Sequence, residues 1–356
     1  MPRVSRKRDF AATTPDGQSL PSSTVTAVLF TCAGQRVDIV TAFERAGATT
    51  IAVDANPLAP ALYHADEHAL VPRIDDPGYV DALRELIETH DIRLVVPLTD
   101  LDQVLLAESQ DELGATVLLP DADVVERVGD KYLAHGLAVE RGIPSPATWL
   151  PDEVPEDARF PLLVKARRGF GSRHIYRAAD RAQLDFFLDY TPVDSIVQAV
   201  CRGEEFSIDV FCDLEGRCLN AIPRTMIESK GGESIKGMTI KDWDLIEYGR
   251  LVSETLGLKG PANIQCFRED GGHELTDINP RFGGGFPLPL AAGSRYPELA
   301  LAIANGERPE PRLGEFREGV VMTRFFSHLS LTIGADGELE PFAEEVPEPV
   351  AEPTGD

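Results

Sequence analysis

Short apolar runs alternate with amphipathic stretches from Thr24 to about residue 120, and this alternation limits the possible folds more than any other feature of the sequence. Short apolar runs are typical of buried strands, and apolar residues at helical spacing are typical of surface helices. The expected strands are TAVLFT, TTIAVDA, HALVP, LVVPLT and TVLLP, and the expected helices are VDIVTAFERAG, YVDALRELIETH and LDQVLLAESQDEL. Alternation of this kind predicts an α/β unit with a doubly wound parallel sheet.

The character of the sequence changes near Asp121. Residues 121–149 predict two helices, the second closed by Gly142 and stopped by Pro144. Beyond them, hairpin turns such as DLEGR and EDGGH indicate an α+β region with largely antiparallel sheets. The expected strands are FPLLVKA, SRHIYRA, SIVQAV, EFSIDVFCD, CLNAIPRTM, ANIQCFRE and HELTDIN, and helices are expected near 180–190, 241–257 and 288–305.

Both ends of the sequence are expected to lack a fixed fold. Residues 1–23 are basic at first but contain no apolar stretch of the secretory kind, so we expect a disordered arm. Residues 336–356 are acidic and proline-rich, which predicts a disordered tail. No apolar run approaches the roughly 18 to 20 residues that span a bilayer, and the cysteines suit a reducing compartment. We therefore expect a cytoplasmic protein.

The charge and the spacing of reactive residues exclude several classes of function. The 356 residues carry 59 Asp and Glu against 34 Lys and Arg, a net charge of −25, which repels nucleic acid and anionic membranes. Five cysteines and seven histidines form no zinc-binding spacing, and we find no Ser-His-Asp or Cys-His set. Neither a zinc site nor hydrolase chemistry is expected.

The turn after the first strand, FTCAGQR, lies where a dinucleotide site has its glycines. Only Gly34 is present and GxGxxG is absent, which argues against a nicotinamide-dependent dehydrogenase. Asp54 ends the second strand at the spacing of a ribose-binding acid. Two interpretations stay open: Gly34 and Asp54 contact a small ligand at the sheet edge, or Asp54 only caps a turn.

A glycine-containing basic loop follows the strand that carries Lys165, in FPLLVKARRGFGSRHIY. Gly169 and Gly171 permit a close approach to a ligand, and Ser172 adds a hydroxyl donor, so this loop is a candidate phosphate-covering flap. No Walker A sequence occurs in the chain. The alternative is a structural hairpin with basic side chains.

The most specific pattern lies in NIQCF and HELTDINPRFGGG. Because side chains two residues apart share a sheet face, Asp277 and Asn279 should project together, and Gln265 should join them from the neighbouring strand. Such oxygen donors suit Mg²⁺ shared with nucleotide phosphates. Arg281 follows, where a guanidinium can clamp a transferring phosphoryl group. Gly283–Gly285 come next, with backbone N–H groups able to bind an anion. The alternative is a polar strand end with an Asn-Pro turn.

The order of these elements resembles the ATP-grasp superfamily, in particular one synthetase half of the carbamoyl-phosphate synthase large subunit and related carboxylate-amine ligases. The resemblance rests on Lys131, Lys165, the loop at 169–172, QAVCRGEEFSID and DINPR. It implies a Rossmann-like preATP-grasp domain at 24–120, linker helices and a small lobe at 121–195, and a large lobe at 196–335.

The resemblance also implies roles for individual residues. Lys131 and Lys165 would contact the ATP phosphates together with the glycine loop. The adenine hinge and ribose contacts would come from Gln198, where the family often has Glu, and from Ala199, Val200 and Glu205. The Mg²⁺ or Mn²⁺ ligands would be Gln265, Asp277, where Glu is commoner, and Asn279. PRTMIESKGGESIKG is similar to a loop of the synthase halves, and it would bring Arg224 and Lys230 to the γ-phosphate or an acyl phosphate.

The implied activity is ATP-dependent ligation: a small-molecule carboxylate is activated as an acyl phosphate and passed to an amine, with release of ADP and phosphate. Two alternatives stay open, a bicarbonate-dependent enzyme that forms carboxyphosphate and a non-catalytic ATP-binding relative. Lys230 stands where the synthase halves have His, which argues against bicarbonate. The length of 356 residues is too short for a complete two-half synthase, and no glutaminase segment is visible. A homodimer is compatible with the resemblance.

Overall fold

The computed structural model describes residues 4–6, 25–169, 174–230, 233–269 and 272–342, without the side chains of residues 4–6, 229, 230 and 233. Residues 1–324 and 325–356 form two units, and each is described by itself. Within the described segments, no helix combines the length and the apolar character that a membrane span requires.

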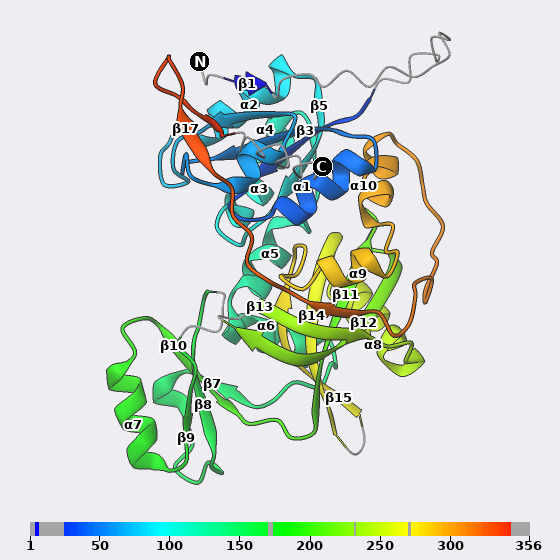
Figure 1. Ribbon diagram of the computed structural model, residues 1–356. Helices are drawn as coiled ribbons and strands as arrows, with labels where there is room; N and C mark the ends of the chain where they lie inside the picture. The colour runs from blue at the N-terminus through cyan, green and yellow to red at the C-terminus, as the bar shows by residue number, and fades with distance from the viewer. Residues whose placement is uncertain (1–3, 7–24, 170–173, 231–232, 270–271, 343–356) are drawn as a thin grey trace, which may run out of the picture. The chain divides into compact units, whose positions relative to one another are not determined.

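The N-terminal domain is built on a six-stranded sheet in the order β1-β4-β3-β2-β5-β6 (Figure 1). Five of its strands run parallel, as the strand–helix alternation predicts: β2 (Ala27–Thr31), β3 (Thr49–Asp54), β4 (Glu67–Leu70), β5 (Ile92–Pro97) and β6 (Thr116–Val117). The connections contain α1 (Val37–Arg45), a 3₁₀ turn at Pro60–His64, α2 (Tyr79–Thr89), α3 (Gln103–Glu108) and α4 (Gln110–Leu113).

Two local expectations for this domain differ from the structure. Residues 4–6 form β1 (Val4–Arg6), antiparallel to β4, where a disordered arm was expected. The outer edge of β4 offers unpaired backbone groups, which a short strand can cover. The single helix expected over 101–113 divides at Ser109, a residue whose side chain competes for backbone hydrogen bonds.

The linker and the small lobe follow. α5 (Ala122–Gly129) and α6 (Lys131–Glu140) are the two helices expected after Asp121. The small-lobe sheet has the order β7-β10-β8-β9, and α7 packs against it. Its elements are β7 (Thr148–Trp149), a 3₁₀ turn at Pro151–Glu153, β8 (Leu162–Ala166), β9 (Tyr176–Ala178), α7 (Arg181–Tyr190) and β10 (Ser195–Ala199). Because β10 pairs with β8, the lobe extends to Ala199 instead of ending at 195.

The large lobe is a six-stranded antiparallel sheet in the order β15-β14-β11-β12-β13-β16. Its strands are β11 (Glu204–Cys212), β12 (Cys218–Lys230), β13 (Glu233–Thr239), β14 (Gly260–Glu269), β15 (Gly272–Asn279) and β16 (Val321–Thr323). Helix α8 (Trp243–Thr255) lies against one face of β11 and β12. Gly249 permits this packing, because a Cβ there would lie 2.7 Å from Ile208. The opposite face carries the polar residues described below.

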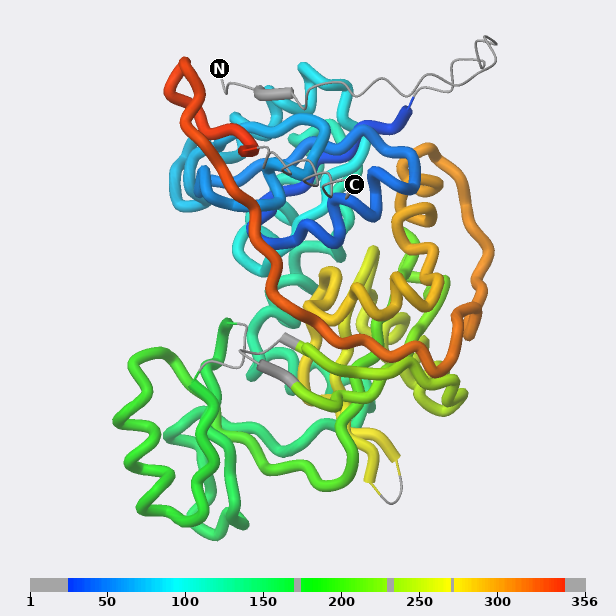
Figure 2. The backbone as a smooth tube through the Cα atoms, in the orientation of Figure 1, coloured from blue at the N-terminus to red at the C-terminus, as the bar shows by residue number. Residues whose placement is uncertain are grey.

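Two further expectations need correction. The stretch PRTMIESKGGESIKG, which resembles a loop of the synthase halves, belongs to a hairpin: the strand expected at CLNAIPRTM continues to Lys230 in β12, and Glu233–Thr239 form β13. The alternating Thr225 and Ile227 favour extended structure. The helix expected over 288–305 is two helices, α9 (Pro287–Ala291) and α10 (Tyr296–Ala304), separated at Gly293 with φ +93°. Figure 2 shows the segment around residue 300 beside the segment around residue 40, and α10 contacts α1.

The second unit contains a short hairpin of β17 (Leu331–Ile333) and β18 (Leu339–Pro341). The start of the acidic segment, expected to be disordered from residue 336, therefore pairs as a strand. Residues 343–356 lie outside the described part of the chain.

Candidate functional site

A row of polar side chains crosses the face of the large sheet opposite α8. Gln265 on β14 lies directly opposite Asp277 on β15, and Asn263 lies opposite Asn279. Residues opposite one another in an antiparallel pair, and residues two apart on a strand, share a face. The structure therefore brings Gln265, Asp277 and Asn279 to one face, as the pattern predicts. The amide Nδ2 of Asn279 donates to Oδ2 of Asp277 at 3.3 Å.

The polar row continues onto β11 through residues that the sequence analysis missed. Ser207 lies opposite Gln265, and Asp209 lies opposite Asn263. Nδ2 of Asn263 donates to Oγ of Ser207 and to Oδ1 of Asp209, both at 2.9 Å. The alternation of polar and apolar residues in EEFSIDV carried this signal, because Ser207 and Asp209 occupy the positions that face away from α8.

Arg224 extends the row onto β12 as half of a buried ion pair. Its Nε donates to Oδ2 of Asp209 at 2.8 Å, and each side chain is only 2% exposed. Gly285 packs directly against the guanidinium, because a Cβ at this position would lie 2.5 Å from Cζ of Arg224. Arg224 thus lies beneath the glycine segment, and its contact with a phosphate stays a prediction.

Arg281, on the segment after β15, is bound by the N-terminal domain. Its Nε and Nη2 donate to the two carboxylate oxygens of Asp100 at 2.8 and 2.7 Å. Nη2 also donates to Oδ1 of Asn279 at 3.1 Å, and Nη1 donates to the carbonyl of Phe282 at 3.3 Å. Arg281, the residue expected to clamp the phosphoryl group, thus uses four of its five N–H donor positions in contacts within the protein.

The segment from Pro280 to Gly283 has further partners in the N-terminal domain. Arg36 donates to the carbonyls of Phe282 and Gly283 at 2.9 and 3.1 Å, and Gln103 donates to the carbonyl of Pro280 at 3.0 Å. No local pattern in the sequence indicates these contacts, because they join residues far apart in the chain. They hold the end of β15 in a fixed position relative to the parallel sheet.

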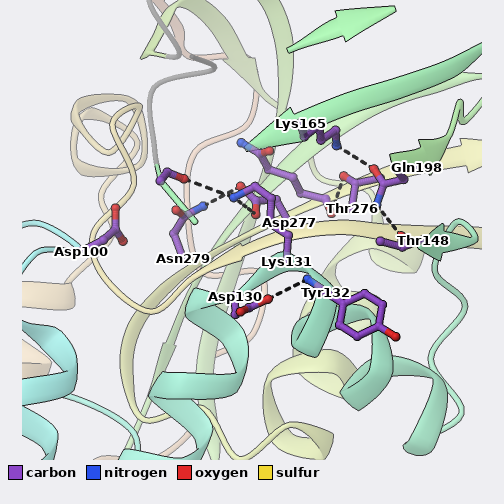
Figure 3. Close-up of polar contacts among 12 residues, drawn as sticks. Asp100, Asp130, Lys131, Tyr132, Thr148, Lys165, Gln198, Thr276, Asp277 and Asn279 are labelled. Carbon is purple, nitrogen blue, oxygen red and sulfur yellow. Dashed lines mark hydrogen bonds and ion pairs between the residues drawn. The ribbon is translucent and has the colours of Figure 1, made fainter. Parts of the chain in front are cut away.

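Lys131 is placed by a helix cap. Asp130 accepts hydrogen bonds from the backbone N–H groups of Tyr132 and Leu133, at 3.0 and 3.3 Å, so Lys131 becomes the first residue of α6. The Lys131 ammonium lies 3.4 Å from Oδ1 of Asp277 and donates to the carbonyl of Gly169 at 3.2 Å (Figure 3). One cation therefore contacts both the carboxylate of the polar row and the first glycine of the flap.

The Asp130 carboxylate is itself held by two arginines, Arg167 and Arg168, which directly follow β8. It accepts from Nε of Arg167 at 2.8 Å and lies 3.2 Å from Nη2 of Arg168. Burial raises the pKa of Asp130, but the hydrogen bonds from Arg167 and the N–H of Leu133, with the positive charges, outweigh it and lower the pKa overall. Asp130 therefore stays ionised and links the start of α6 to the base of the flap.

Lys165, on β8, forms a short chain of hydrogen bonds with β10 and β7. Its Nζ donates to Oε1 of Gln198 at 2.7 Å, and Nε2 of Gln198 donates to Oγ1 of Thr148 at 3.0 Å (Figure 3). Burial lowers the pKa of Lys165, a change that the neighbouring Asp277 partly opposes. Gln198 is thereby fixed in one amide orientation, with its oxygen towards the lysine.

Two further residues of the expected nucleotide site, Ala199 and Glu205, lie near this chain of hydrogen bonds. The N–H of Ala199 donates to the carbonyl of Ala147 at 2.9 Å. Burial raises the pKa of Glu205, with a smaller opposing effect of Lys165. Gly171 and Ser172 lie outside the described residues, as does the side chain of Lys230.

Asp54, the candidate ribose acid of the parallel sheet, uses both of its carboxylate oxygens in the turn. Oδ2 accepts from the N–H of Gly34 and Oδ1 from the N–H of Asn56, each at 2.8 Å. Gly34 has φ +50°, a conformation that favours glycine. This arrangement supports the interpretation of Asp54 as a turn-capping acid.

The donor set of the polar row fits a hard divalent cation that also binds a ligand. In the described segments, no three His, Cys, Asp or Glu side chains gather as they do in an all-protein metal site. Asp277, Asn279 and Gln265 instead offer one carboxylate and two amide groups from adjacent strands. Mg²⁺ is commonly bound by one or two carboxylates together with phosphates of a substrate.

Comparisons with protein families match two parts of the chain. Residues 28–118 match the family described as PylC-like, N-terminal domain. Residues 191–325 match the family described as ATP-grasp in the biosynthetic pathway with Ter operon. The two matches correspond to the parallel-sheet domain and to the segment that runs from β10 through the large sheet.

The chain is also similar to individual proteins. The carbamoyl phosphate synthase large chain of Clostridium beijerinckii is 22% identical over 333 residues, covering 84% of this chain but only 31% of that protein's length. The biotin carboxylase domain of Hydrogenobacter thermophilus 2-oxoglutarate carboxylase, solved with MgADP and bicarbonate, gives a TM-score of 0.66 at 17% identity, covering 83% of this chain and 73% of that chain. The L-amino acid ligase of Bacillus licheniformis gives a TM-score of 0.63 at 19% identity, and the match covers 82% of this chain and 77% of that chain.

Proposed function

The chain belongs to the ATP-grasp superfamily and carries a PylC-like N-terminal domain, and from this premise we propose that it is an ATP-dependent carboxylate-amine ligase. In this proposal a small-molecule carboxylate attacks the γ-phosphate of ATP, and the bond from this phosphorus to the bridging oxygen breaks to release ADP. An amine then attacks the acyl carbon, phosphate leaves, and the amine loses a proton, which gives an amide.

The observation that carries the proposal is the contact of Lys131 with both the metal-binding row and the flap. Its ammonium lies 3.4 Å from Asp277 and 3.2 Å from the Gly169 carbonyl. A nucleotide bound there could place its phosphates beside Lys131, between the carboxylate and the glycine loop. The alternative of a merely structural polar strand end does not account for a cation and two amides gathered around one carboxylate.

The proposal assigns nucleotide binding to the small lobe. Lys131 and Lys165 neutralise the phosphates, the backbone of Ala199 and Val200 contacts the base, and Glu205 contacts the ribose. Gln198 then acts by orienting the Lys165 ammonium, through the 2.7 Å hydrogen bond to its side-chain oxygen. Gly169, Gly171 and Ser172 cover the phosphates in this proposal.

Asp277, Asn279 and Gln265 would hold Mg²⁺ or Mn²⁺, which neutralises charge on the phosphate oxygens when bound. Phosphoryl transfer needs little covalent help from a protein, so charge and positioning supply most of the catalysis. This requirement agrees with a site composed of lysines, arginines, amides and glycines, without an acid–base pair.

The test is ADP release from the purified chain with ATP and Mg²⁺ over a panel of amino acids, offered singly and in pairs. Release that requires one carboxylate and one amine, with equimolar amide product by mass spectrometry, supports the ligase. Release stimulated by bicarbonate alone would instead indicate carboxyphosphate formation, as would be consistent with the similarity to carbamoyl phosphate synthase. Nucleotide binding without turnover over the whole panel would indicate a non-catalytic binder and contradict the proposal.

A further inference from the structure

Asn279 and the N-terminal domain are joined by a continuous chain of hydrogen bonds through Arg281. Asp100 lies on the segment after β5 of the parallel sheet, and both of its carboxylate oxygens accept from the guanidinium, at 2.8 and 2.7 Å. The same Nη2 that binds Asp100 donates to Oδ1 of Asn279 at 3.1 Å. Figure 3 shows Asp100 to the left of Asn279 and Asp277.

The two hydrogen bonds to Asp100 fix the plane of the Arg281 guanidinium. A carboxylate that accepts from both Nε and Nη2 leaves the guanidinium little freedom to rotate, and such charge-assisted pairs are the strong ones. The Arg281 and Asp100 side chains are 13% and 28% exposed, so solvent competes only partly for this pair. The Phe282 carbonyl occupies Nη1 at 3.3 Å from a third direction.

The orientation of the Asn279 amide depends on that plane. An amide oxygen has two acceptor positions, so Oδ1 can accept from Nη2 of Arg281 and still face a cation. Without the arginine, either end of the amide could turn towards Asp277. The Arg281 hydrogen bond therefore selects the observed orientation, in which Oδ1 accepts from Arg281 and keeps its second acceptor position for a cation, while Nδ2 donates to Asp277.

From this chain of contacts we infer that Asp100 and Arg281 are positioning residues, through which the N-terminal domain orients the metal-binding amide of Asn279. The inference rests on the proposed function, because it gives Asn279 a metal to bind. It differs from the clamp expected for Arg281, in which the guanidinium contacts the transferring phosphoryl group directly.

The experiment measures Mn²⁺ binding by electron paramagnetic resonance in the presence of ADP. Calorimetry without metal measures the binding of ADP and of a non-hydrolysable ATP analogue, which carries the γ-phosphate. Loss of a group that orients a metal ligand typically weakens metal binding by about 10- to 100-fold, and we expect this for Asp100→Ala. Metal-free ADP affinity should change by less than about twofold, in the range typical of surface substitutions. The matched control is Asp75→Ala, which removes the same charge from an exposed pair with Arg73.

A double-mutant cycle tests whether Asp100 affects Mn²⁺ binding through Arg281 or independently of it. If Asp100 acts only through Arg281, the double variant Asp100→Ala/Arg281→Ala should bind Mn²⁺ no more weakly than Arg281→Ala alone. Asp100→Asn retains one acceptor and should give an intermediate loss. Because its side chain has nearly the shape of Asp, Asp100→Asn also replaces the alanine variant if that variant unfolds. Thermal unfolding shows whether each variant is folded.

Three results would overturn the inference. Mn²⁺ affinity in Asp100→Ala or Asp100→Asn equal to that of Asp75→Ala would show that Asp100 does not affect metal binding by Asn279. A change in the metal-free affinity for the ATP analogue as large as the change in Mn²⁺ affinity, without a matching change for ADP, would identify Arg281 as a direct ligand of the γ-phosphate. Wild-type protein that binds ADP but no Mn²⁺ would remove the metal from the site, whereas wild-type protein that binds neither would overturn the proposed function as well.

Discussion

The ammonium group of Lys131 lies 3.4 Å from Oδ1 of Asp277, so the candidate metal-binding carboxylate is paired with a cation of its own chain. Lys131 and Asp277 come from different lobes, on α6 and β15. The contact keeps the carboxylate charge compensated in the absence of nucleotide. It also makes the lysine a competitor for any metal that arrives without a phosphate.

Removing this cation should affect metal and nucleotide binding in opposite directions. In Lys131→Met, we expect nucleotide-free Mn²⁺ binding to tighten by about two- to fivefold, because a partly exposed ion pair contributes up to about 1 kcal/mol. Binding of a non-hydrolysable ATP analogue should weaken, because a phosphate partner is lost. Calorimetry measures both, and an unchanged Mn²⁺ affinity would contradict the competition.

Asp277 and Asn279 of the polar row should be required for turnover and not for folding. Asp277→Ala and Asn279→Ala should each lower ADP release by at least about 100-fold, since each removes a group that stabilises the transferring charge. Both side chains are partly exposed, so the thermal unfolding midpoint should stay near that of the wild type. Full activity in either folded variant would refute the metal-binding role.

The fold could be predicted where a local pattern decides the structure. The parallel sheet followed from strand–helix alternation, and the shared face of Asp277 and Asn279 followed from the two-residue period of a strand. The first part of β12 was expected as the strand CLNAIPRTM, but its continuation to Lys230 and β13 were missed, because polar and glycine residues resemble a loop when their sheet partners are unknown. There, tertiary pairing outweighed local propensity.

The part of the site that could not be predicted depends on contacts between distant parts of the chain. Asp100 and Arg281 are 181 positions apart, and Arg36 and Phe282 are 246 apart. No periodicity connects such residues, and an isolated Asp after a strand has many structural explanations. The buried ion pair of Arg224 could not be predicted for a related reason, since its partner Asp209 lies on another strand.

Lys165 should contribute chiefly to nucleotide affinity. Lys165→Ala removes the ammonium that Gln198 orients, so a non-hydrolysable ATP analogue should bind at least about tenfold more weakly, a difference of about 1.4 kcal/mol. Lys259→Ala is the matched control, because Lys259 pairs with Asp121 at the start of α5. Calorimetry compares the two, and equal affinities would exclude Lys165 from the nucleotide site.

The buried Asp209–Arg224 pair should matter for stability whatever its part in catalysis. Arg224→Met leaves the Asp209 carboxylate without its cation, and breaking a buried pair in this way costs about 3–5 kcal/mol. Arg73→Met, in an exposed pair, should change the free energy of unfolding by less than about 1 kcal/mol. Urea denaturation measures both, and similar small changes would show that solvent reaches Asp209.

Asp102 should make the stability of the protein depend on pH. This carboxyl group is fully buried, Tyr79 donates to its Oδ2 at 2.8 Å, and burial raises its pKa above the ordinary value of 3.8. A raised pKa in the folded state means that the native protein retains a proton which the unfolded chain releases, so the stabilising contribution is lost as pH rises through the folded-state pKa.

Asp102→Asn cannot ionise, and it should therefore gain stability relative to the wild type as pH rises above 3.8. The gain should approach about 1.4 kcal/mol per pH unit, the slope for one proton, and level off above the folded-state pKa. Urea denaturation from mildly acidic to mildly alkaline pH measures the difference, with the exposed Asp75→Asn as control. A difference that does not vary with pH, or that shifts in favour of the wild type, would show that Asp102 ionises as readily in the folded protein as in the unfolded chain.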